Sequence, residues 1–345
     1  HYHPSFFVPM KYTFVVDKET CFAHWAQCLV RWSWFFEQYQ YNHYRALAEP
    51  WSKEEDAALD RLRALLEREG YGYLWLWSRY ANRSIDNKED EAVWKEIRDA
   101  LANKFNAAWS LEEPLLRAWK NVLESHDDAA LEGVRNAIAR FLHVGDLMDT
   151  NSVESKLVFR HHTRLPAGHA HERFPNTIIL GVSRVKTTDE CIERVLNVYT
   201  HELTHLMFHR TQTPGELLGA AYRKVIEPKN FSIPGDAKWK YLLMESLLRS
   251  ISSHRLDTYA GRMGARGRES ASASDAKETA ALAVSEIRGN REALIKKVAS
   301  RAEPIVSEYL DAGRPMDEDL CRRIALYWVD LLEEIENLPP RAAVG

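Results

Sequence analysis

Residues 189–210 read DECIERVLNVYTHELTHLMFHR, and the rest of the chain is best interpreted outward from this stretch. Its apolar side chains recur at the three- and four-residue spacing of one helix face: Ile192, Val195, Leu196, Tyr199, Leu203 and Leu206. Thr187 and Glu190 have the spacing of a capping box, which marks a helix start. Proline and glycine at 214–215 interrupt the pattern after it. We therefore predict one amphipathic helix from about Asp189 to Arg210.

Two histidines and a glutamate occupy one turn of this helix. His201 and His205 are four residues apart, so both imidazoles project from one face and can reach a single zinc ion at ~2.0–2.1 Å. Glu202 lies beside that position without being a ligand, where it can accept a proton from a zinc-bound water. The motif therefore predicts one zinc ion per chain and a hydrolytic reaction with Glu202 as general base.

The segment His201-Glu202-Leu203-Thr204-His205 resembles the active-site motif of the zincin superfamily of metallopeptidases. The resemblance covers this motif, its helix and the strand expected before it. It implies hydrolysis of peptide bonds in a peptide or protein substrate. In zincins the strand ahead of the helix is a sheet edge that binds extended substrate through backbone hydrogen bonds. Residues 177–182 (TIILGV) are the candidate for that strand, and an ordinary core strand is the alternative.

The branches of the zincin superfamily differ in the source of the third zinc ligand. Metzincins continue the motif with a turning glycine, whereas Met207 and Phe208 stand here. Gluzincins instead take a glutamate from a later helix, and we expect this residue to be Glu245. It is a lone carboxylate in the apolar segment 241–248 (YLLMESLL), and a buried charge needs a cation or a hydrogen-bond partner. The alternative is a structural ion pair with Arg249 one turn later.

Two other glutamates are alternatives to Glu245. Glu227 lies nearer the spacing common in gluzincins, but Pro228 follows it and disfavours helix there. Glu216 is too close to the motif to come from a separately packed helix. His209 continues the histidine stripe, but it lies ~12 Å along the helix axis from His201. We therefore place His209 outside the ligand set.

The remaining sequence predicts a mostly helical α+β fold, in which a small sheet packs on the motif helix. Strands are expected near residues 11–16 (KYTFVV), 156–160 (KLVFR) and 177–182. We expect residues 1–212 to hold N-terminal helices, the sheet and the active-site helix. Residues 213–345 are expected to form a helical C-terminal subdomain that carries the third ligand.

Several local signals refine this prediction. Asp17 is a plausible cap for the helix that follows it, and two further capping-box spacings, Ser52 with Glu55 and Ser110 with Glu113, predict two helix starts. The segment 161–175 contains four histidines and is expected to be a loop or an irregular hairpin. A second metal site there is an alternative to a solvent-exposed loop.

The composition indicates which binding partners and which cellular compartment to expect. The formal net charge is −4 and no basic block stands out, so nucleic acid is not expected as a partner. The four cysteines are scattered without a Cys-x-x-Cys pair, which fits a reducing compartment. The most apolar run, residues 21–36, is shorter than the ~20 residues of a membrane span and lacks the flanks of a signal peptide. We expect a cytoplasmic protein that does not enter a membrane.

Two other functions remain open. One is a catalytically silent scaffold in which zinc only holds two subdomains together, although such a site has no need of the base Glu202. The other is a non-peptidase zinc hydrolase that acts on a small amide.

Overall fold

The computed structural model describes residues 12–32, 38–69, 88–126, 129–144, 153–160, 167–170, 174, 176–183, 189–231, 238–262 and 290–338. In these residues the fold is mostly helical with one four-stranded mixed sheet, which confirms the α+β class. The chain divides into two compact units, His1–Asp127 with Asn151–Glu202, and Asp128–Thr150 with Leu203–Gly345. No helix in the described ranges is both long and apolar enough to cross a membrane.

The division between the units falls inside helix α7 (Asp189–Phe208). Through Glu202 this helix belongs to the first unit, and from Leu203 it belongs to the second. The sequence-based division at residue 212 instead groups the whole helix with the N-terminal region. Residues Asp128–Thr150 also belong to the second unit, although they precede most of the sheet in the chain.

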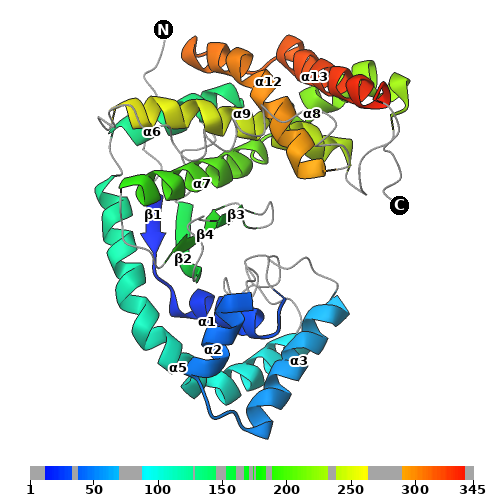
Figure 1. Ribbon diagram of the computed structural model, residues 1–345. Coiled ribbons are helices and arrows are strands. Elements are labelled where there is room, and N and C mark those ends of the chain that lie inside the picture. Colours follow the sequence, from blue (N-terminus) through cyan, green and yellow to red (C-terminus); the bar gives the residue numbers. More distant parts are fainter. Residues whose placement is uncertain are drawn as a thin grey trace. The chain divides into compact units, whose positions relative to one another are not determined.

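The sheet of the first unit has the strand order β1-β2-β4-β3 (Figure 1). Its strands are β1 (Tyr12–Val15), β2 (Val153–Arg160), β3 (Ala167–Ala170) and β4 (Thr177–Ser183). β2 pairs in parallel with β1 and β4, and β3 pairs antiparallel with β4. Three strands confirm the segments expected from sequence. The fourth, β3, shows that the histidine-containing segment forms a hairpin with β4, one of the two alternatives left open.

Strand β4 is an interior strand, so of the two alternatives the ordinary core strand is confirmed and the sheet edge is wrong. Its hydrogen-bonding partners are β2 on one side and β3 on the other. Ile178 through Ser183 are buried, which explains the continuous apolar sequence. A short apolar run indicates burial on both faces but not the neighbours of the strand. Among the described strands, the edge on this side is β3.

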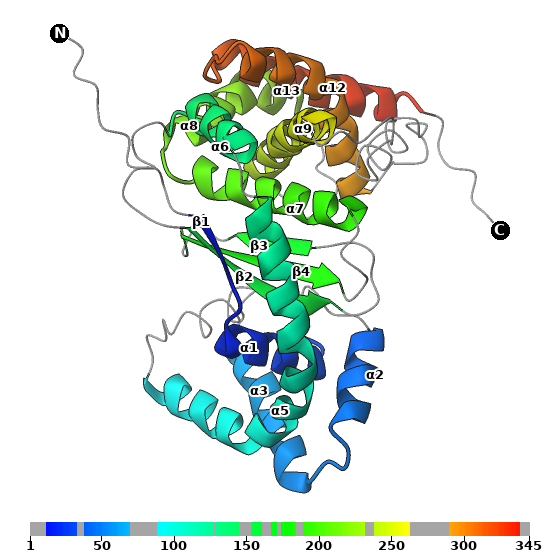
Figure 2. The ribbon, with the colours of Figure 1, turned by 90° about the vertical axis from the view of Figure 1, so that its left-hand side faces the viewer.

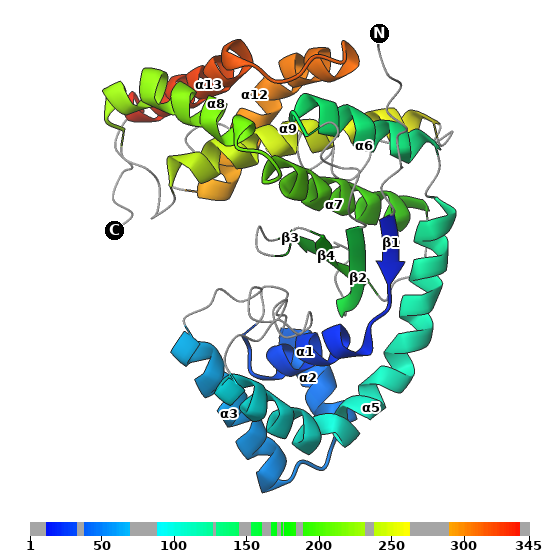
Figure 3. The ribbon, with the colours of Figure 1, turned by 180° about the vertical axis from the view of Figure 1, so that it is seen from behind.

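Helix α1 (Lys18–Leu29) and the N-terminal part of α7 lie on opposite faces of this sheet (Figure 1, Figure 2 and Figure 3). Asp17 caps α1 as expected, because its carboxylate accepts the Thr20 backbone N–H at 3.2 Å. The His24 ring nitrogen Nε2 lies 2.8 Å from the carbonyl oxygen of Phe159 on β2. On the other face, Phe14 of β1 contacts Tyr199 of α7, with ring centroids 5.4 Å apart. Packing against the sheet therefore fixes the helix that carries the motif.

Of the three capping-box predictions, the one at Thr187 lies outside the described residues, and the other two had different outcomes. Ser52 and Glu55 exchange both expected hydrogen bonds, at 2.7 and 3.2 Å, and begin α3 (Lys53–Glu69). At Ser110 the prediction is wrong, because α5 (Lys88–Ser125) continues through it and the hydroxyl donates to the Ala107 carbonyl at 3.0 Å. Buried side chains on both sides of Ser110 form one continuous helix face: Trp94, Ile97, Leu101, Phe105, Ala108, Leu116, Trp119 and Leu123. Packing of this face outweighs the local signal.

The aromatic core of the first unit lies beneath the sheet, on the side of α1. Trp25 is fully buried and contacts the rings of Phe22, Tyr44 and Phe105. Tyr44 comes from α2 (Gln38–Leu47) and Phe105 from α5. The indole N–H of Trp119, also on α5, donates to the Ser183 carbonyl of β4 at 2.9 Å. The aromatic core therefore joins α1, α2 and α5, and α5 is also attached to the sheet.

The described residues of the second unit form helices joined by turns, without a strand. Besides the end of α7, it contains α6 (Ala129–Phe141), α8 (Thr213–Ala221), the π-helical turn η2 (Tyr222–Ile226), the 3-10 turn η3 (Glu227–Lys229), α9 (Trp239–Arg262), α12 (Arg291–Asp311) and α13 (Glu318–Glu336). The Trp328 indole of α13 donates to the Ser246 hydroxyl of α9 at 3.1 Å. The Ser250 hydroxyl, also of α9, donates to the Ala299 carbonyl of α12 at 3.0 Å. These bonds, made one and five residues after Glu245, hold α9 in place.

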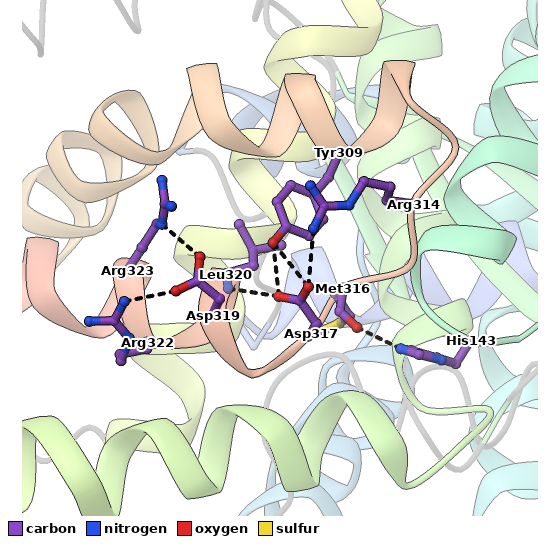
Figure 4. A network of polar contacts seen from close by, with 9 residues as sticks. All are labelled: His143, Tyr309, Arg314, Met316, Asp317, Asp319, Leu320, Arg322 and Arg323. Atoms are coloured by element: carbon purple, nitrogen blue, oxygen red, sulfur yellow. Dashed lines mark hydrogen bonds and ion pairs between the residues drawn. The ribbon is translucent and has the colours of Figure 1, made fainter.

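The turn between α12 and α13 is held by a polar network (Figure 4). Asp317 caps α13 by accepting the Leu320 backbone N–H at 2.9 Å, and it also accepts the Tyr309 hydroxyl at 2.9 Å. The Met316 backbone N–H donates to the Phe141 carbonyl at 2.9 Å, and the His143 ring nitrogen donates to the Met316 carbonyl at 2.7 Å. The end of α6 is thereby attached to this turn.

Candidate metal centre

Helices α7 and α9 bring three potential metal ligands together. One ring nitrogen each of His201 and His205 and one carboxylate oxygen of Glu245 lie within 4.8 Å of one another. The two histidines lie one turn apart on α7, as their spacing predicts. Glu245 Oε1 of α9 lies 3.2 Å from His205 Nε2. This group could hold a metal ion.

The donor set fits zinc. Two atoms bound to a tetrahedral zinc ion at ~2.0–2.1 Å lie about 3.4 Å apart, close to the separation between His205 and Glu245. Two imidazoles and one carboxylate are also a ligand set that zinc accepts. In the described part of the chain this group has three members. Three protein ligands would leave one position of a tetrahedral ion for a further group.

Glu245 has a second partner on its own helix. Its other oxygen, Oε2, lies 3.4 Å from Nε of Arg249, one turn later on α9. Glu245 is 4% exposed, so its charge requires such compensation. The sequence left open a metal ligand or an ion pair at this residue. In the structure the two carboxylate oxygens face different partners, so the ion pair does not preclude a role as ligand.

The general-base candidate, Glu202, lies against strand β3. It is 8% exposed, and its side chain packs where Gly168 of β3 has no side chain of its own. A Cβ atom added to Gly168 would stand 2.5 Å from Glu202 Cγ and 2.6 Å from Val198 Cγ1. Contacts between real Cβ atoms and neighbouring carbons are far longer, so any larger residue at position 168 must displace the strand or Glu202.

The other candidates for the third ligand lie elsewhere. Glu216 is in the first turn of α8, and Glu227 begins the 3-10 turn η3; both are exposed. His209 is also exposed and follows the last residue of α7. Among the residues that the structure describes, none of the three belongs to the ligand group. Of the four histidines in the β2–β4 connection, His169 lies on β3, and His161, His162 and His171 lie outside the described residues.

Sequence reasoning missed the role of Gly168. A lone glycine in a short segment between Pro166 and the histidines carried no pattern that linked it to the motif. Only the pairing of β3 with β4, which places β3 beside α7, reveals the close approach. Comparisons of the chain with protein-family models, with curated proteins and with solved structures find no match.

Proposed function

We propose that this chain is a zinc-dependent metallopeptidase of the zincin type, gluzincin-like in its ligands. His201, His205 and Glu245 hold the zinc ion, and Glu202 is the general base. The observation that carries this proposal is the ligand group itself. A glutamate chosen from sequence as the third ligand lies on a separate helix within metal-binding distance of both motif histidines.

The roles of the residues follow from their chemistry. Zinc bound by this group supplies Lewis acidity, which polarises a carbonyl and makes a water molecule acidic. The carboxylate of Glu202 accepts a proton from the attacking water and transfers it to the leaving amine nitrogen. The Glu202 side chain is buried against Gly168 of β3, which limits the positions that it can take. Holding a base in place is itself a source of rate acceleration.

A sheet edge beside the base favours a peptide over a small amide as substrate. β3 is an edge of the described sheet, and its Gly168 contacts the base helix. An extended peptide can add to such an edge through backbone hydrogen bonds. A small amide has no extended backbone to use it. The proposed substrate is therefore a peptide or an extended segment of a protein.

Two measurements test this function. Protein purified without affinity-resin metal should contain about one zinc ion per chain by elemental analysis. Glu202→Gln should keep this zinc and its fold but lose peptide hydrolysis by ~10²–10⁴-fold, because the amide cannot act as a base. Glu216→Gln, an exposed glutamate outside the ligand group, is the matched control and should retain activity.

Each alternative has a distinct outcome. A wild-type protein that binds zinc but cleaves nothing in a peptide library or a small-amide panel is a metal-binding scaffold. Cleavage of small amides alone identifies a non-peptidase hydrolase. Full activity in Glu202→Gln would refute the assignment of Glu202 as base. The proposed enzyme would be refuted if the zinc content is well below one per chain and added zinc does not restore it.

A further inference from the structure

Arg249 connects the proposed metal ligand Glu245 to a second carboxylate. Its Nε lies 3.4 Å from Glu245 Oε2, and its Nη1 lies 2.7 Å from Glu292 Oε1 in the first turn of α12. All of these residues, and His205, belong to the second unit. They form a row: His205, Glu245, Arg249 and Glu292. The burial of the side chains changes along it, from 6% exposed at Glu245 to 28% at Arg249 and 52% at Glu292.

We propose that Arg249 is a positioning residue for the metal centre, which holds Glu245 so that only Oε1 faces the two histidines. This inference rests on the proposed zinc site. Arg249 and the ligand group use different oxygens of the same carboxylate, so Arg249 and a metal ion can be bound at once. Side chains that hydrogen-bond to a ligand fix its orientation and contribute to metal affinity. A carboxylate held at Oε2 binds the metal through one oxygen rather than two.

Arg249 also has an unfavourable effect, because a positive charge near the site repels a divalent cation. Glu292 decides which effect is larger. At 2.7 Å from the guanidinium its carboxylate compensates the charge of Arg249, so that the pair is close to neutral when seen from the metal. Repulsion is therefore small, and the orientation of Glu245 is the dominant effect. The loss of Arg249 should lower metal affinity even though it removes a positive charge.

The two residues of this pair should consequently respond differently to substitution. Arg249→Met keeps much of the aliphatic side chain but removes the donor, and it should weaken zinc binding by about 10–100-fold at any salt concentration. Glu292→Gln keeps the residue's size but leaves the charge of Arg249 uncompensated. It should weaken zinc binding by only a few-fold at low ionic strength, and less at high salt, because salt screens partly exposed charges.

The experiment is competition for zinc between the purified full chain and a chromophoric chelator at two salt concentrations. Arg301→Met is the matched control: Arg301 of α12 is 26% exposed and binds Glu334 of α13 at 2.8 and 3.0 Å, and neither residue belongs to the ligand group. Its zinc affinity should equal that of the wild type. Arg249→Lys keeps the charge but not a guanidinium that can donate to two carboxylates at once. Its zinc affinity should lie between those of the wild type and Arg249→Met.

Unchanged or tighter zinc binding by Arg249→Met would overturn the proposal, because it would make the Arg249–Glu245 pair a structural contact or a competitor of the metal. If Arg249→Met does not fold, Arg249→Lys, which retains the positive charge, is the test in its place. Unchanged or tighter zinc binding by this variant would then overturn the proposal. Failure of the wild type itself to bind zinc is a separate result, which refutes the metal site on which this inference depends. A loss of zinc affinity in Arg301→Met equal to that in Arg249→Met would also overturn it.

Discussion

Two buried glutamates, Glu112 on α5 and Glu245 on α9, are equally hidden from solvent, each 4% exposed. Their partners differ in kind. Glu112 accepts a hydrogen bond from the Tyr44 hydroxyl at 2.7 Å. Glu245 faces the imidazole of His205 and the guanidinium of Arg249. Burial alone therefore does not distinguish the two carboxylates; the chemistry of their partners does.

The surroundings of Glu112 are those of a packed interior. Burial and the neighbouring charge of Glu112 raise the pKa of the Tyr44 phenol well above its usual value, so Tyr44 remains a hydrogen-bond donor. The Tyr44 oxygen in turn accepts from Gln40 Nε2 at 3.2 Å, and Gln40 Nε2 lies 2.9 Å from the Phe159 carbonyl oxygen. This network connects α5 and α2 to β2. Its contribution is to the stability of the first unit, whereas that of Glu245 is proposed to be metal binding.

The largest expected difference between the two glutamates is in metal affinity. Glu245→Ala removes a proposed ligand and should weaken zinc binding by more than the ~10–100-fold that loss of a supporting residue costs. Glu112→Ala should leave zinc affinity unchanged. Chelator competition measures both. Equal zinc affinities in the two variants would show that Glu245 and Glu112 do not differ in metal binding.

The next effect concerns another buried glutamate, Glu202. Gly168→Ala should force Glu202 or strand β3 aside, because the new Cβ would lie 2.5 Å from Glu202 Cγ. A displacement near 1 Å at a reacting group costs up to ~10²-fold in rate, so kcat for peptide hydrolysis should fall by about that factor with zinc retained. Zinc content and peptide hydrolysis are measured on the same sample.

Gly181→Ala is the control for this test. Gly181 lies opposite Ala167 in the adjacent strand β4, and its added Cβ would meet the side chain of Arg160 rather than Glu202. Both variants add one methyl group to the same sheet. An equal loss of activity in the two would show that the effect comes from strain in the sheet and not from the position of the base.

A smaller effect is expected on stability, where Glu112 is the more important of the two glutamates. Glu112→Ala leaves the buried Tyr44 hydroxyl without this acceptor and should lower the free energy of unfolding by about 1–3 kcal/mol. Its neighbour Glu113 is partly exposed and pairs with Arg117 one turn later. Glu113→Ala should cost at most ~0.5 kcal/mol. Urea denaturation compares them, and equal midpoints would contradict a structural role for Glu112.

The smallest effects are expected at the two alternative glutamates. Glu216→Ala and Glu227→Ala change exposed side chains outside the ligand group, so zinc content and peptide hydrolysis should stay at wild-type levels. Surface substitutions of this kind usually change stability by less than ~0.5 kcal/mol. If Glu227→Ala alone removes the metal, then Glu245 is the wrong carboxylate.

Local patterns predicted much of the first unit correctly. The strands β1, β2 and β4, the Asp17 cap and the Ser52–Glu55 capping box lie where the sequence indicated them. These features depend on residues close together in the chain. The Ser110 capping box failed for the opposite reason: the apolar face of α5 packs against distant parts of the unit, and this packing overrides a weak local preference.

The sequence by itself determined the positions of His201 and His205 on one helix face. Their spacing is a property of a single helix, and helical geometry requires no knowledge of the rest of the fold. It also nominated Glu245, since a lone carboxylate in an apolar helix needs a partner.

Only the tertiary structure decided which atoms those residues meet. Glu245 reaches His205 through the packing of α9, β4 is interior because β3 folds back on it, and Gly168 touches Glu202 because β3 lies against α7. Each of these contacts joins segments far apart in the chain. The physical reason is that burial and periodicity specify which face of an element is covered, whereas the identity of the covering element depends on how the whole chain packs.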